Sequence, residues 1–472
     1  MTHIDYSSRT DSPADDAGLT ELAEQVAGRV LSPADPEYAP ETALFNLHLT
    51  LTPAVVVVAA QASDVEAAVR FAAKRDMPIA VKASGHQVVL PAVGGVLINT
   101  ENMKGLTIDR DRRTARAEAG VLWDQVLNAA AAENLSPMPG STAHVGVVGY
   151  TLGGGLSPVF GRSKGFAADH VLSMDVVLAD GRLRTVTADS DPDLFWAMRG
   201  CKGNFGVVTA IEFDLFPGTR VYGGSLYYAG ANLAEVMHAW REWISTLPEE
   251  ATSSLAVQRL PDVPELPQVL RGAFVVHLRF SHLGGFQEGE LAVEPMRRIA
   301  PVILDTLADM PLTEMGTIHN DPAEPLPYWD RQTSLRELPA AAVDAFVEAL
   351  GPDSGSELVH VEVRHLGGAM GREPAVPNSV PLRDVPFYVF GFGVGPAERE
   401  EVLTENLLRF VNALKPWASP HLVPNFLSAD EATTPEEMRA MFGADKYERL
   451  LRIKAAYDPA NLFRINHNVR AV

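Results

Sequence analysis

Two strands joined by a helix are predicted between residues 55 and 82, and this arrangement constrains the fold more than any other feature of the sequence. Residues 55–59 form an apolar, β-branched run that is typical of a buried strand. Apolar residues then recur at helical spacing behind Ser63, the expected N-cap, until Pro78 ends the helix before a strand at residues 79–82. A strand, a helix and a strand within about 30 residues form a βαβ unit, whose two strands run parallel in one sheet.

The rest of the chain contains both strands and helices, with a boundary predicted at Pro217-Gly218. Asp180-Gly181 between two apolar runs predicts a β-hairpin. Before the first strand, residues 1–40 are polar and contain several prolines, so we expect a loose N-terminal arm. Beyond the boundary we predict strands at residues 255–260, 273–280, 358–365 and 387–394, and helices at residues 233–245, 340–350 and 398–414.

Composition excludes several classes of function. The chain has 472 residues, with 39 Lys and Arg against 60 Asp and Glu, so its formal net charge of −21 opposes nucleic-acid binding. The single cysteine, Cys201, excludes an internal disulfide and a multi-cysteine zinc site, and we expect no metal. The apolar run at residues 53–60 is too short to span a bilayer, and the first residues lack signal-peptide features. We therefore expect a cytoplasmic protein that does not bind membranes.

Two glycine-containing segments indicate a bound phosphate. Seven glycines crowd residues 140–161, and a Ser84-Gly85-His86 turn follows the strand predicted at residues 79–82. Glycine tolerates positive φ and close approach of a ligand, and the backbone N–H groups of such loops bind phosphate. Neither GxxxxGK[ST] nor GxGxxG after a strand occurs, so a P-loop or an ordinary Rossmann site is not expected. One cluster alone would favour a tightly packed turn, but two favour a ligand.

Four motifs resemble one protein family in order and spacing. Residues 80–86 (AVKASGH) are similar to the phosphate-binding loop of FAD-dependent oxidoreductases of the vanillyl-alcohol oxidase/p-cresol methylhydroxylase (PCMH) family, and most similar to its berberine-bridge-enzyme-like branch. The similarity continues at residues 140–155 and again at 193–197 and 203–209. It ends with YDPANLFRIN at residues 457–466.

This resemblance implies an architecture. The expected fold class is α+β, with a two-part PCMH-type FAD-binding domain and a substrate domain whose mixed or antiparallel sheet is covered by helices. After the arm at residues 1–40, we expect the FAD-binding domain at residues 41–218 and the substrate-binding domain at 219–420. Residues 421–472 are then expected to return to the FAD domain.

The resemblance also implies how FAD is held. His86 takes the place of the histidine that is often bonded to the flavin 8α-methyl in this family, so we expect an 8α-histidyl link. Thr142 stands where many relatives carry a second linking cysteine, and threonine cannot replace a thiolate, so the link through His86 is expected to be the only one. The residues expected to bind FAD are Lys82, Ala83, Ser84, Gly85, His86, Gln87, Gly140, Ser141, Thr142, Gly146, Gly149, Tyr150, Thr151, Gly153, Gly154, Asn204, Gly206, Val208, Asn466 and Asn468.

Candidate catalytic residues lie on two of the strands predicted beyond residue 218. Strand alternation puts Glu362 and Arg364 on one face and the neighbouring valines on the other. By resemblance, Glu362 is the first candidate for proton abstraction, and Arg364 would hold its charge or that of the substrate. Tyr388, which starts an alternating aromatic strand, is the third candidate. A solvated sheet face and an aromatic core are the alternatives for these two strands.

The resemblance implies an FAD-dependent oxidase that takes a hydride from a C–H bond of a small alcohol, amine or secondary metabolite. Flavin N5 would receive the hydride, and dioxygen would be reduced to hydrogen peroxide. A flavin-bearing protein that sequesters a metabolite, and a dehydrogenase with another electron acceptor, are the alternatives. The expected partners are the small-molecule substrate and dioxygen, with the chain a monomer or a homodimer.

Overall fold

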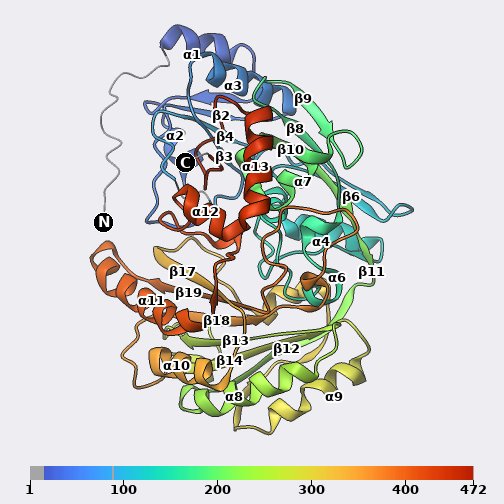
Figure 1. The fold of residues 1–472 in the computed structure, drawn as a ribbon, viewed down its shortest axis with the longest axis vertical. Helices are drawn as coiled ribbons and strands as arrows, with labels where there is room; N and C mark the ends of the chain where they lie inside the picture. The colour runs from blue at the N-terminus through green and yellow to red at the C-terminus, as the bar shows by residue number, and fades with distance from the viewer. Residues whose placement is uncertain (1–14, 88–89, 471–472) are drawn as a thin grey trace.

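The computed structural model describes residues 15–87 and 90–470, and Figure 1 shows how the elements of this part of the chain are arranged. The first sheet contains the predicted βαβ unit, which is confirmed. Helix α3 (Ala62–Lys74) connects β2 (Val55–Val58) to β3 (Ile79–Lys82), and both strands run parallel to β4 (Val96–Asn99). β4 lies between them, so the two strands share the sheet without pairing directly.

The N-terminal cap of α3 differs from the prediction. Gln61 is the N-cap residue, and Ser63 lies inside the first turn of the helix. The next residue, Asp64, is fully buried, and its carboxylate accepts hydrogen bonds from the backbone N–H groups of Ala27 (2.9 Å), Gly28 (3.0 Å) and Ala60 (2.9 Å). The Asp64 carboxylate therefore joins residues 27–28 to the start of α3. The Ser63 hydroxyl does not cap the helix.

This contact explains why the predicted arm is ordered over the residues described. Residues 15–42 include α1 (Asp16–Ala23), β1 (Arg29–Leu31) and α2 (Tyr38–Thr42), and β1 pairs antiparallel with β2. The prediction of a loose arm is therefore wrong for residues 15–40, whose polar composition hid a short edge strand. Residues 1–14 lie outside the described residues.

The second sheet is antiparallel and has the order β5-β6-β10-β8-β9. The predicted hairpin at Asp180-Gly181 joins β8 to β9, with Gly181 at φ = +71°. Helices α12 and α13, near the C-terminus, pack into the core of this sheet together with α4, α5 and α7. The elements are β5 (Leu106–Asp109), β6 (Thr114–Glu118), β8 (Val171–Val177), β9 (Leu183–Val186), β10 (Val207–Asp214), α4 (Trp123–Ala132), α5 (Val147–Leu152), α6 (Gly161–Lys164), α7 (Pro192–Cys201), α12 (Pro435–Phe442) and α13 (Ala444–Tyr457).

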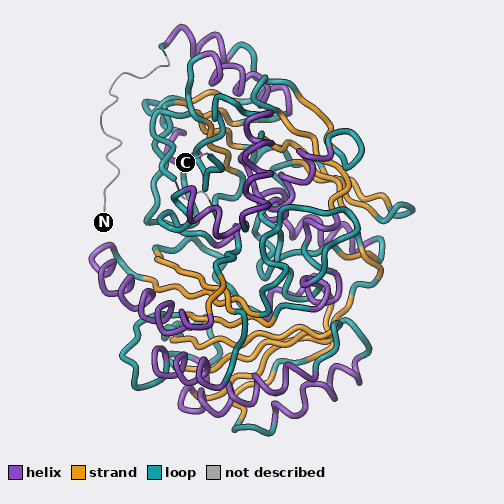
Figure 2. Tube along the Cα trace, in the orientation of Figure 1, coloured by secondary structure: helices purple, strands orange, loops and turns teal. Residues whose placement is uncertain are grey.

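The third sheet has nine strands and is antiparallel in every pairing. It forms the layer of orange strands in the lower half of Figure 2. A small ribbon of β7 (Leu135–Ser136) and β11 (Phe216–Pro217) precedes it in the chain. The strands are β12 (Arg220–Ala229), β13 (Ala251–Arg259), β14 (Phe274–His282), β15 (Val302–Asp305), β16 (Ala308–Pro311), β17 (Tyr328–Leu335), β18 (His360–His365), β19 (Phe387–Val394) and β20 (Ala418–Ser419). Four of the strands that the sequence analysis did not predict are β12, β15, β16 and β17.

The two faces of the third sheet differ in chemistry. Apolar side chains such as Leu255, Leu278 and Val363 pack against helices on one face. These helices are α8 (Leu233–Trp243), α10 (Ala340–Leu350) and α11 (Glu400–Leu414), with α9 (Phe286–Arg297) at the side of β12. In Figure 1 they lie below the sheet, so the other face, which carries Glu362 and Arg364, is directed toward the first two sheets. The predicted α+β class with a helix-covered antiparallel sheet is confirmed.

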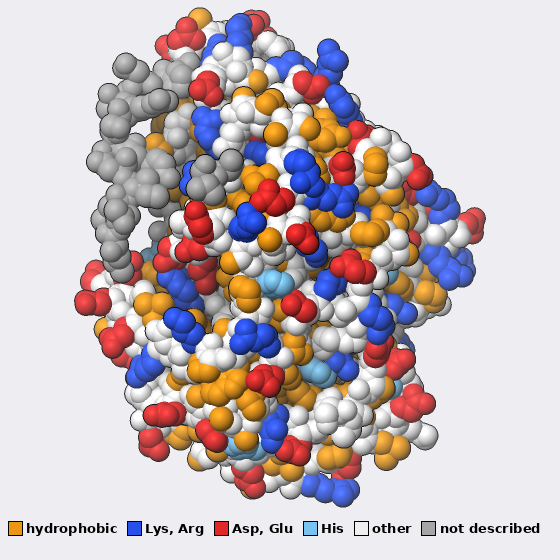
Figure 3. All heavy atoms as spheres, viewed as in Figure 1, with side chains coloured by type: hydrophobic (Ala, Val, Ile, Leu, Met, Phe, Trp, Pro, Cys, Tyr) orange, Lys and Arg blue, Asp and Glu red, His pale blue; other side chains and the backbone are white. Residues whose placement is uncertain are grey.

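The face of the molecule shown in Figure 3 carries charges of both signs. On the face shown in Figure 3, Lys and Arg side chains are interspersed with Asp and Glu. Within residues 15–87 and 90–470, helices that combine the length and the apolar composition needed to cross a membrane are absent. The same residues contain no cluster of His, Cys, Asp and Glu that could hold a metal ion.

Candidate active site

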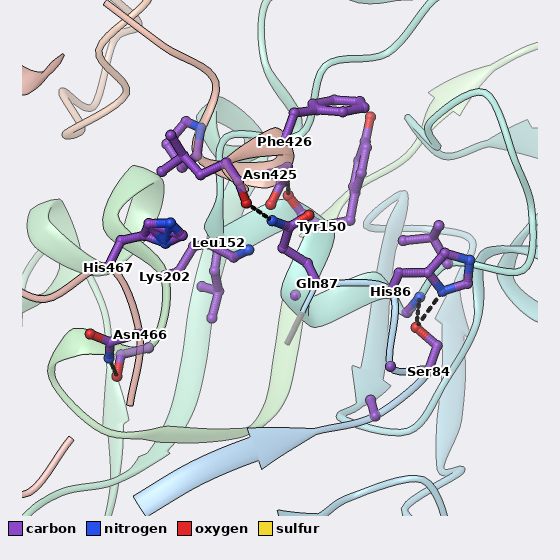
Figure 4. Close-up of a pocket in the computed structure, with 18 of the residues that line it drawn as sticks. Ser84, His86, Gln87, Tyr150, Leu152, Lys202, Asn425, Phe426, Asn466 and His467 are labelled. Atoms are coloured by element: carbon purple, nitrogen blue, oxygen red, sulfur yellow. Dashed lines mark hydrogen bonds between the residues drawn. The ribbon is translucent and has the colours of Figure 1, made fainter. Parts of the chain in front are cut away.

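A cavity of about 410 Å³ lies where the first two sheets, the C-terminal segment and the polar face of the third sheet meet. We call one side the loop wall, which consists of the lining residues in segments 83–87, 140–152, 201–208 and 465–467. We call the other side the sheet wall, which consists of the side chains of Asp330, His360, Glu362, Arg364, Phe390 and Phe392 on β17, β18 and β19. Figure 4 shows part of this cavity.

His86 on the loop wall is held in a defined position. The residue before it, Gly85, adopts φ = +74°, and the chain turns there at the end of β3. The Ser84 hydroxyl lies 3.2 Å from His86 Nδ1 and accepts a hydrogen bond from the backbone N–H of Gly146 at 3.2 Å, while the ring of Phe45 stacks on the imidazole at 4.3 Å. Burial, with a smaller contribution from His144, lowers the pKa of His86 to about 4. The imidazole is therefore neutral, as nucleophilic attack by its nitrogen requires.

The loop wall leaves space at its glycines. A Cβ added at Gly149 or Gly203 would meet no atom within 4 Å, although both residues line the cavity. The backbone is thus exposed to the cavity where a side chain would project into it. The Tyr150 hydroxyl on the same wall is buried and has no hydrogen-bond partner among the described residues. A long, flat dinucleotide with polar groups along its length fits this wall.

Most of the predicted cofactor residues lie on the loop wall. Those that line the cavity are Ala83, Ser84, Gly85, His86, Gln87, Gly140, Ser141, Thr142, Gly146, Gly149, Tyr150, Asn204, Gly206, Val208 and Asn466. Five others lie behind it, namely Lys82, Thr151, Gly153, Gly154 and Asn468. The Lys82 ammonium points to Glu101 at 3.8 Å, and the Thr151 hydroxyl donates to the Val147 carbonyl at 2.8 Å, so both side chains are engaged within the protein.

On the sheet wall, Glu362 is surrounded by positive charge. Its carboxylate lies 2.6 Å from Arg279 Nη1 and 2.8 Å from Arg364 Nε, and it accepts a hydrogen bond from Ser254 Oγ at 2.6 Å. Burial by itself would raise the pKa of Glu362, but Arg364 and Arg279 outweigh it and hold this pKa well below the usual value. Glu362 is therefore a fixed anion with a low affinity for a proton.

Asp330 on β17 is a second carboxylate on the sheet wall, and the sequence analysis did not identify it. It lies opposite Phe392 of β19, and its Oδ1 accepts a hydrogen bond from Ser428 Oγ at 2.6 Å. Burial raises the pKa of Asp330 to about 6. Behind it, the backbone N–H of Ser428 donates to Glu431 at 3.0 Å, and burial raises the pKa of Glu431 to about 7. The polar run at residues 330–334 carries no alternation that would indicate a strand, so only the pairing of β17 with β19 places Asp330 on this wall.

Tyr388 is not on the cavity wall. Its side chain is fully buried in an apolar cluster with Val380 and Leu382, and its hydroxyl has no partner among the described residues. Phe390 and Phe392 of the same strand do line the cavity. The aromatic strand therefore contributes the apolar part of the sheet wall, and Tyr388 supports it from the side.

A lysine on the loop wall was also missed. Lys202 lines the cavity in the η2 turn (Lys202–Asn204), beside Gly203. The signal available in the sequence is a lysine inside an otherwise glycine-rich segment, Gly200-Cys201-Lys202-Gly203. A charged side chain among glycines that approach a ligand indicates contact with that ligand.

Comparisons with known proteins agree with this geometry. A family model described as FAD binding domain matches residues 53–187, and a model described as berberine and berberine like matches residues 425–470. An uncharacterized FAD-linked oxidoreductase of Bacillus subtilis is 25% identical over 461 residues, which cover 94% of this chain and 97% of that protein. The (R)-6-hydroxynicotine oxidase of Paenarthrobacter nicotinovorans is 27% identical over 466 residues, with 94% and 97% coverage.

A solved structure extends the similarity to the whole fold. The berberine bridge enzyme from Eschscholzia californica superposes with a TM-score of 0.80 at 17% identity, covering 97% of this chain and 99% of that one. With the two domain matches and the full-length relatives, these findings define the chain as an FAD-linked oxidoreductase. It is similar to the vanillyl-alcohol oxidase/PCMH-type flavoproteins, and its C-terminal domain match and its fold are those found in the berberine-bridge-enzyme-like branch.

Proposed function

We propose that this oxidoreductase is an oxidase that removes a hydride from a C–H bond of a small organic substrate held between the two walls of the cavity. The observation that carries the proposal is the cavity itself, which joins a glycine-lined dinucleotide site to an aromatic and charged sheet face. Bound FAD would supply a hydride acceptor at N5 and a route for two electrons to dioxygen, which would leave as hydrogen peroxide.

In this proposal the loop wall holds FAD and His86 attaches it. Residues 41–218 and 421–472 form the FAD-binding part, and residues 219–420 form the substrate-binding part. The neutral imidazole of His86 supports a single covalent link to the flavin 8α-methyl. Thr142, which lines the cavity, offers no thiolate for a second link, and burial raises the pKa of the single cysteine, Cys201, to about 12.

The sheet wall favours a substrate with an apolar or aromatic body and a polar reacting group. Phe390 and Phe392 offer aromatic surface between the β18 residues and Asp330. Small alcohols, amines and secondary metabolites have this character, and a relative is named for the oxidation of a hydroxynicotine. We favour such a metabolite over a sugar because aromatic rings bury apolar surface.

The substrate must also lose a proton, and three carboxylates of the described residues line the cavity. Burial by itself would raise the pKa of Asp321, but His319 and Arg279 outweigh it and hold this pKa below its usual value. This leaves Glu362 and Asp330 to compete for that role.

Glu362 was predicted first, but a carboxylate held by two arginines is a weak base. Asp330, whose pKa burial raises to about 6, is better suited to accept a proton from a substrate hydroxyl or amine near neutral pH. We therefore propose Asp330 as the proton acceptor, with Glu362 as the anion that fixes Arg364 on the wall.

A visible spectrum and a metabolite panel test the function. Purified protein should show flavin absorbance, and a substrate should bleach the flavin band under anaerobic conditions and produce hydrogen peroxide in air. Binding without bleaching would identify a sequestering protein instead. Bleaching followed by slow reoxidation in air would identify a dehydrogenase with another electron acceptor.

A further inference from the structure

Lys202 is a cation on the cavity wall for which the described residues supply no counter-charge. Within the described residues, Arg364 on the sheet wall is the only other lysine or arginine that lines the cavity, and it is bound to Glu362. Burial alone lowers the pKa of Lys202 to about 7, and no carboxylate raises it. A cation in this situation is unfavourable unless an anion enters the cavity.

The groups around Lys202 do not provide that anion. Figure 4 places Lys202 beside His467 and Leu152, across the pocket from His86. Burial, reinforced by the charge of Lys202, lowers the pKa of His467 to about 4, so this histidine is neutral. His467 Nε2 lies 3.0 Å from the Ser428 carbonyl oxygen. The carboxylates that line the cavity, Asp321, Asp330 and Glu362, are not among the groups that shift the pKa of Lys202.

The backbone at Lys202 is also unusual. Its φ is +53°, a region that favours glycine, and the chain before it passes through Gly200 at φ = +131°. A side chain is thus kept at a position where glycine would be less strained. Strained residues of this kind are concentrated at ligand-binding sites.

We propose that the Lys202 ammonium binds the diphosphate of FAD from the side of the cavity opposite the Ser84-Gly85-His86 turn, and that it supplies the main protein counter-charge of the diphosphate. The inference rests on FAD as the cofactor of this site. The diphosphate carries two permanent negative charges, whereas the glycine turns of the loop wall offer only N–H dipoles. Lys202 is the residue of the loop wall whose positive charge can neutralise part of the diphosphate charge.

Ligand titrations of a variant that cannot attach FAD covalently, which we call the host, test the proposal. The host is full-length His86→Ala apoprotein, titrated with FAD, with ADP, which carries a diphosphate without a flavin, and with riboflavin, which carries a flavin without phosphate. In this host, Lys202→Met should weaken FAD and ADP binding by about tenfold or more and leave riboflavin binding unchanged. Lys202→Arg should keep both affinities, and Lys415→Met, at an exposed lysine, is the matched control.

The outcomes separate this inference from the proposed function. Wild-type protein without flavin absorbance, together with a host that binds no FAD, would refute FAD use itself, whatever residue 202 is. FAD and ADP affinities unchanged in Lys202→Met would refute the role of Lys202, and an equal loss for riboflavin would show that the charge acts on the flavin ring instead. Lys202→Gly removes the strain of a positive φ at a non-glycine residue. This variant should therefore be at least as stable as the host and should still bind ADP more weakly.

Discussion

The loop wall of the cavity presents backbone and glycine, whereas the sheet wall presents charged side chains that are paired with one another. Segments of the loop wall such as Ser84-Gly85-His86 act through local conformation, so a few neighbouring residues are sufficient to build each one. Glu362 on the sheet wall depends on Arg279, 83 positions away in the sequence (362 − 279) and on another strand. The comparison shows that a cofactor site can be encoded locally while the groups that act on substrate need the register of a whole sheet.

The largest expected effect concerns the attachment point on the loop wall. His86→Ala should abolish the covalent link, because no other nucleophile is proposed for the 8α-methyl. Acid precipitation of the wild-type protein should give a yellow pellet, and the variant should release all of its flavin into the supernatant. Thr142→Ala is the control and should keep the yellow pellet, and a colourless wild-type pellet would remove the covalent link from the proposal.

The sheet wall should lose stability when its central anion is neutralised. Glu362→Gln leaves Arg279 and Arg364 buried without a counter-charge, so the free energy of unfolding should fall by about 3 kcal/mol. Urea denaturation measures this change. Glu357→Gln removes an exposed partner of Arg399 and should change stability by less than about 1 kcal/mol. Equal effects in the two variants would mean that the buried cluster is not a stabilising unit.

The two carboxylates of the sheet wall should differ in catalysis. Asp330 must be ionised to accept a proton, so flavin reduction by a substrate found in the panel should become faster as the pH rises through about 6 and then level off. Asp330→Asn should slow reduction by about 100-fold and remove this inflection. Stopped-flow measurements from pH 5 to 8 provide the profile.

Two further variants decide between the carboxylates. Asp430→Asn, at an exposed partner of Arg331, is the matched control and should retain the inflection at a slightly lower pH, because the charge of Asp430 helps to raise the pKa of Asp330. If Glu362→Gln abolished the inflection and Asp330→Asn did not, the acceptor would be Glu362, as the sequence first indicated.

The smallest expected effects separate a glycine that serves the ligand from one that serves packing. Gly149 lies in α5, so Gly149→Ala should stabilise the apoprotein by about 0.5–1 kcal/mol while weakening FAD binding a few-fold. In Gly206→Ala the new Cβ would lie 2.7 Å from Val176 Cγ1, so stability should fall by about 1–3 kcal/mol. Thermal melts with and without FAD measure both changes. Loss of apoprotein stability in Gly149→Ala would mean that this glycine is structural too.

Sequence reasoning located the loop wall well and the sheet wall only in part. His86 and Gly146 were identified because turns with positive φ or close approach leave a trace in neighbouring residues. Glu362 and Arg364 were placed on one face by alternation, which the register of β18 confirms. Asp330 was missed because β17 was not recognised, and Tyr388 was included because alternation does not show which side chains reach a cavity.

The sequence by itself determined the βαβ unit, the glycine turns and the position of His86, because each depends on residues within one turn or one βαβ unit. The α+β class and the FAD site followed from the order and spacing of several such motifs, which resemble one family. Only the tertiary structure decided that Glu362 is an ion-paired anion, that Asp330 retains affinity for a proton and that Lys202 faces the cavity without a partner in the part of the chain that the structure describes. Proton affinity and charge pairing depend on burial and on groups from distant strands, and these are brought together only when the chain folds.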